Sequence, residues 1–300
     1  MKSEFLILST LLLCGMTMGA RGADNTAAAS DSRATLRVMS FNVRNSHAWD
    51  GFNGWLFRKK MFFQTIEKFN PDLVGFQEVL ANQYDAIEST MKDYALSGVA
   101  RNDGKRQGEW ALIVYRKSRF ELLDSGNFWL SKTPTVPGSK SWDAGLTRIC
   151  SWVLLRDRQT RKEFLYANTH YDNSGAIARE NSSRIIMKKL PKLAKGNPII
   201  LTGDFNTTED DPPYKTIMHP TEPDMAHFID SYREVHPVRS PNEASYNAFQ
   251  GRLKGSRIDF ILHTPEFKAI SATIDRTKSP EGRTPSDHYP VTAVLQWAKS

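Results

Sequence analysis

A carboxylate and an amide follow directly on an apolar run in residues 198–214, PIILTGDFNTTEDDPPY. Asp204 and Asn206 come just after residues 199–201, which read as a buried β-strand. Taken alone, a Gly-Asp-x-Asn sequence can simply stabilise a turn. The other interpretation is that the two side chains take part in catalysis, because functional groups are often displayed where the strands of a rigid sheet end.

Polar residues fall at the ends of other apolar, β-prone runs along the chain. If these ends converge, they form a cleft that contains carboxylates, imidazoles and amides. The residues concerned are Asn42, Glu78, Glu109, His170, Asp204, Asn206, Asp259, Asp287 and His288.

Such a set of side chains suits the hydrolysis of a phosphate ester. Mg²⁺ takes carboxylate, amide and water oxygens, and it polarises a phosphoryl oxygen. Asn and His can donate hydrogen bonds to oxygens on which charge develops. A carboxylate can orient and deprotonate the attacking water.

Several of these residues also have structural interpretations. A lone His170 would fit a histidine with a satisfied hydrogen bond, and Arg148 in GLTRIC would fit a surface charge. Asp259 is harder to explain in this way, since a carboxylate between Ile258 and Phe260 needs a partner. The combination across several segments favours the functional interpretation.

The chain resembles the endonuclease/exonuclease/phosphatase family of Mg²⁺-dependent phosphoester hydrolases over residues 36–298. Seven segments carry the resemblance in order: MSFNVR, GFQEV, GEWALIVYR, NTHYDN, LTGDFN, SRIDFIL and SDHYPV. The resemblance implies a four-layer α/β sandwich, with two facing, mainly antiparallel sheets and outer helices. The site is then expected at one end of the two sheets.

The resemblance also implies roles for individual residues. Asn42, Glu78 and Asp287 are expected at a Mg²⁺ site that Mn²⁺ can also fill. Asp204, supported by Asn206, is expected to position or deprotonate the water. The remaining expectations are two carboxylate–imidazole pairs, Asp259 with His288 and Glu109 with His170, and a phosphate clamp that consists of Arg148 together with Asn206.

The substrate is left open among several alternatives. SRIDFIL lacks the Trp-Cys-Asp-Arg element of inositol phosphatases, and residues 128–148 look most like a secreted or cytosolic bacterial branch distantly similar to deadenylase-type RNA exonucleases. We therefore expect a phosphodiesterase or nuclease, either exo or endo. The alternatives are a phosphomonoesterase, a sphingomyelinase-like enzyme that acts on membranes, and a non-catalytic secreted protein that binds anionic ligands. A membrane-acting enzyme would need an exposed aromatic hairpin, for which Phe128 and Trp129 could serve, but burial of this pair is the favoured interpretation.

The elements that must position these residues can be read from hydrophobic patterns. Two helices are expected, over 58–69 and 176–194, and Pro191 should end or kink the second. The acidic run at 209–211 reads as a solvated helix start before Pro212. Strands are expected at 36–43, 72–79, 110–116, 119–124, 149–155, 163–170, 198–205, 257–263 and 290–297.

The N-terminus has the layout of a secretory signal. Lys2 precedes an apolar run and small residues follow, which predicts a signal peptide over 1–23 and a disordered lead-in over 24–35 before one catalytic domain, 36–300. We expect a secreted or periplasmic bacterial protein, in which Asn181 and Asn206 would escape glycosylation. Membrane contact is expected only if Cys14 is lipidated.

Charge and cysteine content add two expectations. The formal net charge of +7 suits an anionic partner, namely a phosphate-ester substrate and, as one candidate, nucleic acid. No obligate protein partner is inferred. Cys150 lies in the apolar run ICSWVLL and is expected to be a buried thiol.

Overall fold

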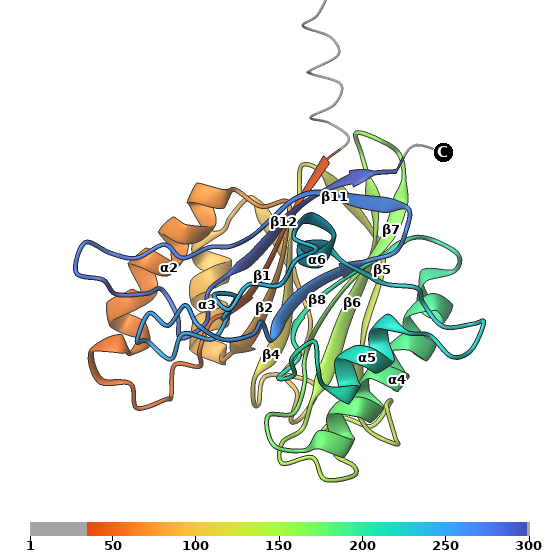
Figure 1. The fold of residues 1–300 in the computed structure, drawn as a ribbon, viewed down its shortest axis with the longest axis horizontal. Coiled ribbons are helices and arrows are strands. Elements are labelled where there is room, and N and C mark those ends of the chain that lie inside the picture. Colours follow the sequence, from red (N-terminus) through yellow and green to blue (C-terminus); the bar gives the residue numbers. More distant parts are fainter. Residues whose placement is uncertain (1–34, 299–300) are drawn as a thin grey trace, which may run out of the picture. The chain divides into compact units, whose positions relative to one another are not determined.

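A computed structural model describes residues 35–298, which form two six-stranded sheets with helices beside them (Figure 1). The first sheet has the order β11 (Phe267–Ile274), β12 (Val291–Trp297), β1 (Thr35–Asn42), β2 (Leu73–Val79), β4 (Trp110–Arg116) and β3 (Tyr94–Ser97). The second has the order β5 (Phe120–Trp129), β6 (Ile149–Asp157), β7 (Glu163–His170), β8 (Ile199–Asp204), β10 (Asp259–His263) and β9 (Ile229–Asp230).

Each sheet contains one parallel pair of strands among antiparallel neighbours. β1 runs parallel to β2, and β7 runs parallel to β8. Parallel neighbours need a crossover connection, and a helix provides it in both cases: α2 (Trp55–Phe69) after β1 and α4 (Ala176–Ala194) after β7. A short 3-10 turn, η1 (Gly51–Asn53), leads into α2.

The two sheets pack face to face through apolar side chains. Leu36 and Leu73 of the first sheet share one buried cluster with Phe164 and Ile200 of the second. Strands alternate their side chains between two faces, so each sheet also has an outer apolar face that must be covered.

Helices cover these outer faces. On the first sheet, Phe41 and Phe76 pack against Phe62 of α2 and Ile87 of α3 (Ala81–Thr90). On the second, the cluster around Leu201 includes residues of α4 and of α5 (Pro212–Met218). The small helix α6 (Ser231–Val235) lies against β10 and β11. The layers are therefore helix, sheet, sheet and helix, and the predicted fold class is confirmed.

A buried amide ties the two sheets together near the ends of the strands. Asn168 of β7 donates hydrogen bonds to the backbone oxygens of Phe76 (2.8 Å) and Leu112 (3.1 Å) in the first sheet. Its own oxygen accepts hydrogen bonds from Gln77 (2.7 Å) and Thr202 (3.1 Å). The sheets are thus held by hydrogen bonds as well as by apolar contacts.

All nine predicted strands and both predicted helices are present. Pro191 does not end α4: it lies in the last turn, and the helix continues to Ala194. The helix start expected before Pro212 is also present, since α5 begins there. The sequence patterns missed β3, β9, β11, α3 and α6. The expected signal peptide and lead-in lie outside the described residues, except for Thr35, with which β1 begins.

Phe128 and Trp129 are buried at the end of β5, as the favoured interpretation predicted, and do not form a membrane hairpin. The Trp129 indole nitrogen donates a hydrogen bond to the backbone oxygen of Arg101 at 2.6 Å. These two rings are therefore core residues, because large aromatic side chains gain most from burial. Among residues 35–298, no helix is long and apolar enough to cross a membrane.

The acidic run at 209–211 is solvated only in part. Asp210 is exposed, but the side chain of Glu209 is only 9% exposed and pairs with Arg233 (2.7 Å) and with the fully buried Arg257 (2.5 Å). A buried guanidinium needs such partners, and Asp230 supplies a further carboxylate to Arg257 at 2.7 Å. The prediction of a simple solvated helix start is wrong for Glu209.

Cys150 is buried on β6, where Phe128 of β5 and Thr169 of β7 are its partners on the two neighbouring strands. Burial raises the pKa of its thiol. The expectation of a core thiol is confirmed.

Candidate active site

The strand ends that carry the predicted residues converge on one cavity of about 320 Å³. Asn42 and Asp259 lie just behind its wall and bond to residues that line it. The predicted residues that line the cavity directly are Glu78, Glu109, Arg148, His170, Asp204, Asn206, Asp287 and His288.

Strand register brings three of these side chains together. His170 ends β7, Asp204 ends β8, and Asp259 begins β10. Asp204 is the register partner of His170 on one side and of Asp259 on the other. Directly paired residues project from the same face of a sheet, so these three groups stand side by side.

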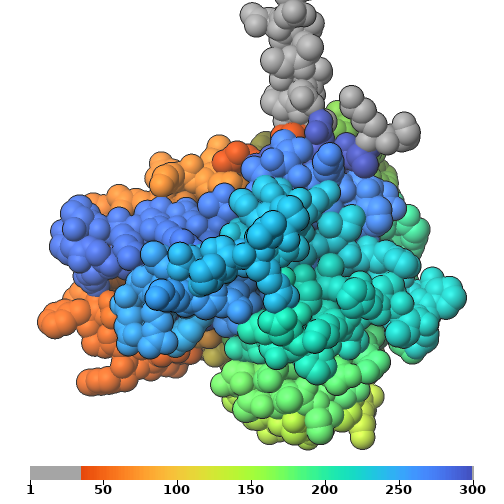
Figure 2. Space-filling model, in the orientation of Figure 1, coloured from red at the N-terminus to blue at the C-terminus, as the bar shows by residue number. Residues whose placement is uncertain are grey.

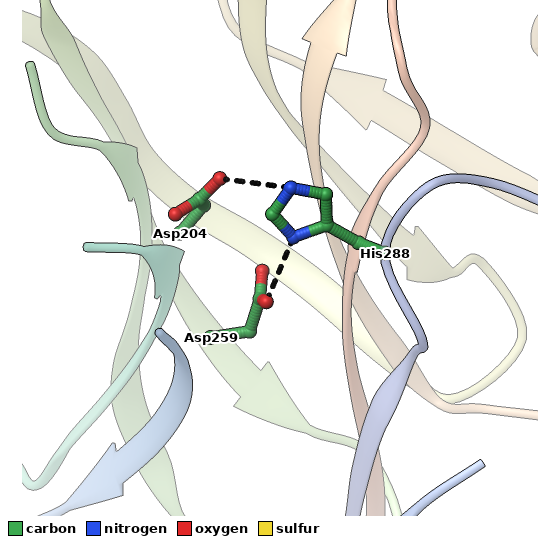
Figure 3. Close-up of side chains that lie close together, drawn as sticks. All are labelled: Asp204, Asp259 and His288. Carbon is green, nitrogen blue, oxygen red and sulfur yellow. Dashed lines mark hydrogen bonds and ion pairs between the residues drawn. The ribbon is translucent and has the colours of Figure 1, made fainter. Parts of the chain in front are cut away.

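His288 joins this row from the loop before β12 (Figure 3). Its Nδ1 lies 2.9 Å from Asp259 Oδ2, and its Nε2 lies 3.7 Å from Asp204 Oδ2. Burial opposes protonation of the ring, but the two carboxylates outweigh it and hold the pKa of His288 well above its usual value. The expected Asp259–His288 contact is present, and it fixes a charged imidazole beside Asp204.

Asp204 is the most crowded carboxylate of the site. Burial, together with the nearby charge of Asp259, raises the pKa of Asp204 to about 7. Its oxygens accept hydrogen bonds from the Asn42 amide (2.9 Å) and from the Asn206 backbone (3.0 Å). A carboxylate with such a pKa can accept a proton near neutral pH, as a general base must.

Glu78 and Asp287 are two carboxylates that face the same cavity. The backbone of Glu78 has a positive φ of 62°, where the pairing of β2 with β4 shifts register between Phe76 and Val79. Such irregularities redirect side chains next to functional sites. Burial opposes ionisation of Glu78, but hydrogen bonds from Asn42 and Asn45 outweigh it and lower its pKa.

The charge of Glu78 affects the pKa of Asp287. Burial raises the pKa of Asp287, and Glu78 adds to that rise. Two buried like charges on one cavity destabilise each other unless a cation lies between them. Their oxygen-rich chemistry, with Asn42 beside them, fits a hard divalent cation.

Asp204, Asp259 and His288 also offer ligand atoms that lie within 4.8 Å of one another. The His288 Nδ1 is already engaged by Asp259 at 2.9 Å. The raised pKa of His288 keeps a proton on both ring nitrogens, so the ring offers no lone pair to a metal ion and the arrangement suits a charged carboxylate–imidazole pair better than a metal site.

The second predicted pair, Glu109 with His170, does not form. Glu109 Oε2 instead lies 2.6 Å from the guanidinium of Arg101, and the Arg101 backbone nitrogen bonds to the Glu109 carbonyl. Burial raises the pKa of Glu109, and Arg101 offsets part of that rise. An adjacent arginine is the stronger partner for a buried carboxylate, because it is always charged.

His170 makes a different contact. The Asn206 amide nitrogen lies 3.0 Å from His170 Nε2 and 3.0 Å from the Tyr171 carbonyl. Burial, with the charges of Arg148 and Arg101, holds the pKa of His170 well below its usual value. A neutral ring that accepts at Nε2 carries its proton on Nδ1, and this Nδ1 has no hydrogen-bond partner among the described residues.

Arg148 presents a nearly desolvated cation to the cavity, with a side chain only 4% exposed. Its Nη2 donates to Asn173 at 3.2 Å, and its Nε lies 3.5 Å from Asp172. Within the described part of the chain, Nε and Nη1 make no hydrogen bond. A buried guanidinium with unused donors is suited to a bound oxyanion.

The sequence patterns missed several residues of the cavity. Arg44 and Asn45 line it and follow Asn42 in FNVRN, so their position after a strand end was a usable signal. Asn173, in NTHYDN, offered the same signal. Tyr246 also lines the cavity, and Arg101 contacts Glu109 without lining it. Both lie in segments without a periodic pattern, where nothing in the sequence pointed to the site.

Fold and cavity together define a class: an α/β sandwich whose acidic, histidine-containing cavity suits phosphate esters. The model of the endonuclease/exonuclease/phosphatase family matches residues 39–288, and the chain belongs to this family. The members of this superfamily are phosphoester hydrolases.

Solved and curated relatives agree with this assignment. The structure of a Bacteroides thetaiotaomicron mannosyl-6-phosphatase is 35% identical, with a TM-score of 0.79 over 87% of this chain and 100% of that one. Drosophila melanogaster nocturnin is 24% identical over 78% of this chain and 41% of its own length. A probable RNA exonuclease of Saccharomyces cerevisiae is 25% identical over 54% of this chain and 34% of its own length. The chain thus spans less than half the length of these two curated relatives.

Proposed function

We propose that the chain is a divalent-metal-dependent hydrolase of phosphate monoesters, with phosphorylated sugars as the substrate class. The observation that carries this proposal is the shared cavity, which brings Asp204 and the Asp259–His288 pair together with the carboxylates of Glu78 and Asp287. The first group can activate water while the second holds a cation.

Glu78 and Asp287, with the Asn42 oxygen close by, would hold Mg²⁺ or Mn²⁺. When bound, such a cation polarises a phosphoryl oxygen and neutralises developing charge. Asn42 has a second task in this scheme, because its amide nitrogen bonds to both Glu78 (3.0 Å) and Asp204 (2.9 Å). It therefore fixes the carboxylates of Glu78 and Asp204 relative to each other.

Asp204 would orient the attacking water and take its proton. Its raised pKa suits this role, since a base works best when its pKa is close to the operating pH. Asn206 supports Asp204 through its backbone nitrogen, and the neutral His170 accepts a hydrogen bond from the Asn206 amide. These contacts hold the base without charging its surroundings.

His288 and Arg148 would bind the phosphate oxygens from two sides. The charged His288 can donate from Nε2 to an oxygen on which charge builds up, while Asp259 holds its Nδ1. Arg148 has two unused donor atoms and can clamp a further oxygen.

Two observations support a monoester substrate. The relative named mannosyl-6-phosphatase aligns over its whole length at 35% identity. The cavity is limited to about 320 Å³ and contains both Arg148 and His288, which suits a compact dianionic group. A phosphate monoester carries more charge to neutralise than a diester does.

A nuclease is the second candidate. The net charge of +7 and the similarity to a probable RNA exonuclease favour a nucleic-acid phosphodiester. A nuclease would use the same catalytic groups and would differ only in its substrate, whose phosphorus is esterified on two sides instead of one.

A substrate panel tests both candidates. Mannose 6-phosphate, glucose 6-phosphate, bis(4-nitrophenyl) phosphate, and single-stranded RNA and DNA are offered with Mg²⁺, Mn²⁺ or a chelator. We expect release of inorganic phosphate from the sugar phosphates, no release with chelator, and a loss of about 10²- to 10⁴-fold in Asp204→Asn. Asp210→Asn, a change at an exposed aspartate, should keep full activity.

Two results would refute the proposal. Hydrolysis that persists in chelator contradicts the metal requirement, and full activity of Asp204→Asn contradicts the proposed base. Cleavage of RNA or the diester, with sugar phosphates untouched, would instead select the second candidate.

We also propose export across a bacterial inner membrane, on the signal-like pattern of residues 1–23. N-terminal sequencing of the protein isolated from the periplasmic or medium fraction should find a start near residue 24. A cytoplasmic protein that retains Met1 would contradict this.

A further inference from the structure

Four large apolar side chains are exposed together between β1 and the first turn of α2. Trp49 is 100% exposed, Phe52 81%, Leu56 85% and Phe57 60%. The rings of Phe52 and Phe57 are in contact, with centroids 5.9 Å apart. Their segment, coloured orange, projects at the lower left of Figure 2. We call these four residues the apolar rim. Clusters of exposed apolar residues commonly mark interaction sites.

The backbone beneath the apolar rim is fixed. The guanidinium of Arg58 is buried and donates to the carbonyls of Asn53 (2.9 Å) and Arg44 (2.6 Å). Asp50 accepts two hydrogen bonds of 2.9 Å from Arg44, and Arg283 donates to the Phe52 carbonyl. These contacts stabilise the segment by themselves, so its aromatic side chains can remain exposed instead of packing into the core.

The apolar rim has basic neighbours. Phe57 lines a surface cavity of about 350 Å³ together with Arg58, Lys60, Glu281 and Arg283. Apart from the buried Arg58, Lys60 and Arg283 face one carboxylate there, so this surface carries an excess of positive charge. Lysines and arginines beside exposed aromatic and aliphatic groups are typical of surfaces that bind anionic lipid.

The apolar rim also adjoins the catalytic cavity. Asp50 lies between Trp49 and Gly51 and binds Arg44, which lines that cavity with Asn45. A surface on which the apolar rim rests would therefore lie close to the mouth of the site.

We propose that the apolar rim and its basic neighbours dock on the interface of an anionic lipid membrane. Leu56 has no π-face, and Phe52 and Phe57 turn toward each other, so the set is poorly suited to the stacking of nucleobases or sugars. Aliphatic and aromatic groups together are suited to the acyl boundary of a bilayer, and Lys60 and Arg283 to its phosphates. Docking does not depend on the proposed hydrolase activity, although it would present the cavity to phosphate esters at a membrane surface.

Vesicle binding by the full chain tests this proposal. Vesicles of phosphatidylcholine, with or without one quarter phosphatidylglycerol, are sedimented with the wild type and with a Trp49→Ser/Phe52→Ser double variant. We expect the wild type to prefer anionic vesicles, and the double variant to bind them about tenfold or more weakly. Val238→Ser is the matched control, since Val238 is 82% exposed on another segment, and it should bind as the wild type does.

A second measurement isolates Trp49 from any other membrane contact of the chain. Lipids with brominated acyl chains quench the fluorescence of an inserted indole. Quenching should occur in the wild type and be absent in Trp49→Ser. Both variants should hydrolyse a soluble phosphate ester as the wild type does, which confirms that they are folded.

Equal vesicle binding by the wild type and the double variant, or equal quenching with and without Trp49, would overturn the proposal. The proposal would also be overturned if the double variant bound vesicles as the wild type does but lost binding to single-stranded oligonucleotides. The same holds if it bound vesicles normally but no longer self-associated in size-exclusion chromatography. Binding is measured without turnover, so an inactive wild-type protein that still binds vesicles through Trp49 would refute only the proposed function.

Discussion

At the scale of single residues, Asp204 is a carboxylate of the site whose ionised form is strongly disfavoured, by burial and by the nearby charge of Asp259. Its pKa of about 7 in the folded protein exceeds the value near 3.9 expected in the unfolded chain. The folded protein therefore retains a proton that the unfolded chain has already released. The contribution of Asp204 to the free energy of unfolding therefore falls as the pH rises from about 4 toward 7, and it is fully lost above 7.

Asp204→Asn should accordingly stabilise the metal-free protein more at pH 8 than at pH 5. Asparagine has the same shape but carries no charge to desolvate. In chelator, we expect the Tm difference between variant and wild type to grow by about 2 °C or more over this range. Thermal unfolding followed by circular dichroism measures it, with Asp210→Asn as the control. A difference that shrinks with rising pH would contradict the raised pKa.

Arg148 is the second residue with a specific expectation. Arg148→Ala should raise KM for the phosphate ester by about 10- to 100-fold, because two buried donors are lost. Arg148→Lys should restore little of this, since an ammonium cannot reproduce the planar guanidinium. Steady-state kinetics checks both variants, and Arg239→Ala, at an exposed arginine, is the control. An unchanged KM in Arg148→Ala would remove the phosphate clamp.

The identity of the site residues could be predicted from sequence better than their partners could. Polar residues at strand ends pointed to the cavity, because a β-sheet brings its strand ends together. The pairing of Glu109 with Arg101 could not be predicted in this way. Arg101 reaches the site from a turn, where no periodic pattern places a side chain.

At the scale of elements, the amide of Asn168 connects strands of both sheets. Asn168→Ala should lower the free energy of unfolding by about 2–3 kcal/mol, because it leaves the buried carbonyls of Phe76 and Leu112 without their side-chain donor. Chemical denaturation measures the loss. Asn197→Ala is a matched control, since its amide bonds to one carbonyl in a half-exposed position. Equal costs at the two positions would show that the link between the sheets adds nothing.

Length and burial decided which elements could be predicted. The nine predicted strands are mostly apolar runs, and α4 has a clear helical pattern. β11 has the burial pattern of an edge strand, with several exposed residues, and β9 has two residues, so neither gives a strong periodic signal. Pro191 misled the helix prediction because a proline in the last turn costs only a local hydrogen bond.

At the scale of the whole molecule, the cavity should couple metal binding to folding. A cation that binds only the folded protein stabilises it by about 2.7 kcal/mol at one hundred times its Kd. We expect Mg²⁺ or Mn²⁺ to raise the Tm of the wild type, and to raise it much less in Glu78→Gln and Asp287→Asn. Differential scanning fluorimetry over a range of metal concentrations tests this, with Ca²⁺ as a comparison. An identical metal-induced shift in all three proteins would place the cation elsewhere.

The buried thiol of Cys150 makes the second sheet accessible to measurement. The strand that carries it has β5 on one side and β7 on the other, and β7 ends at His170. The sulfur lies in the apolar cluster that α4 and α5 cover, so a thiol reagent can reach it only when this layer opens, and the rate of labelling measures that opening. In a chain in which Cys14 is replaced by serine, this single reaction would report whether a ligand at the cavity slows the opening of the layer that covers the second sheet.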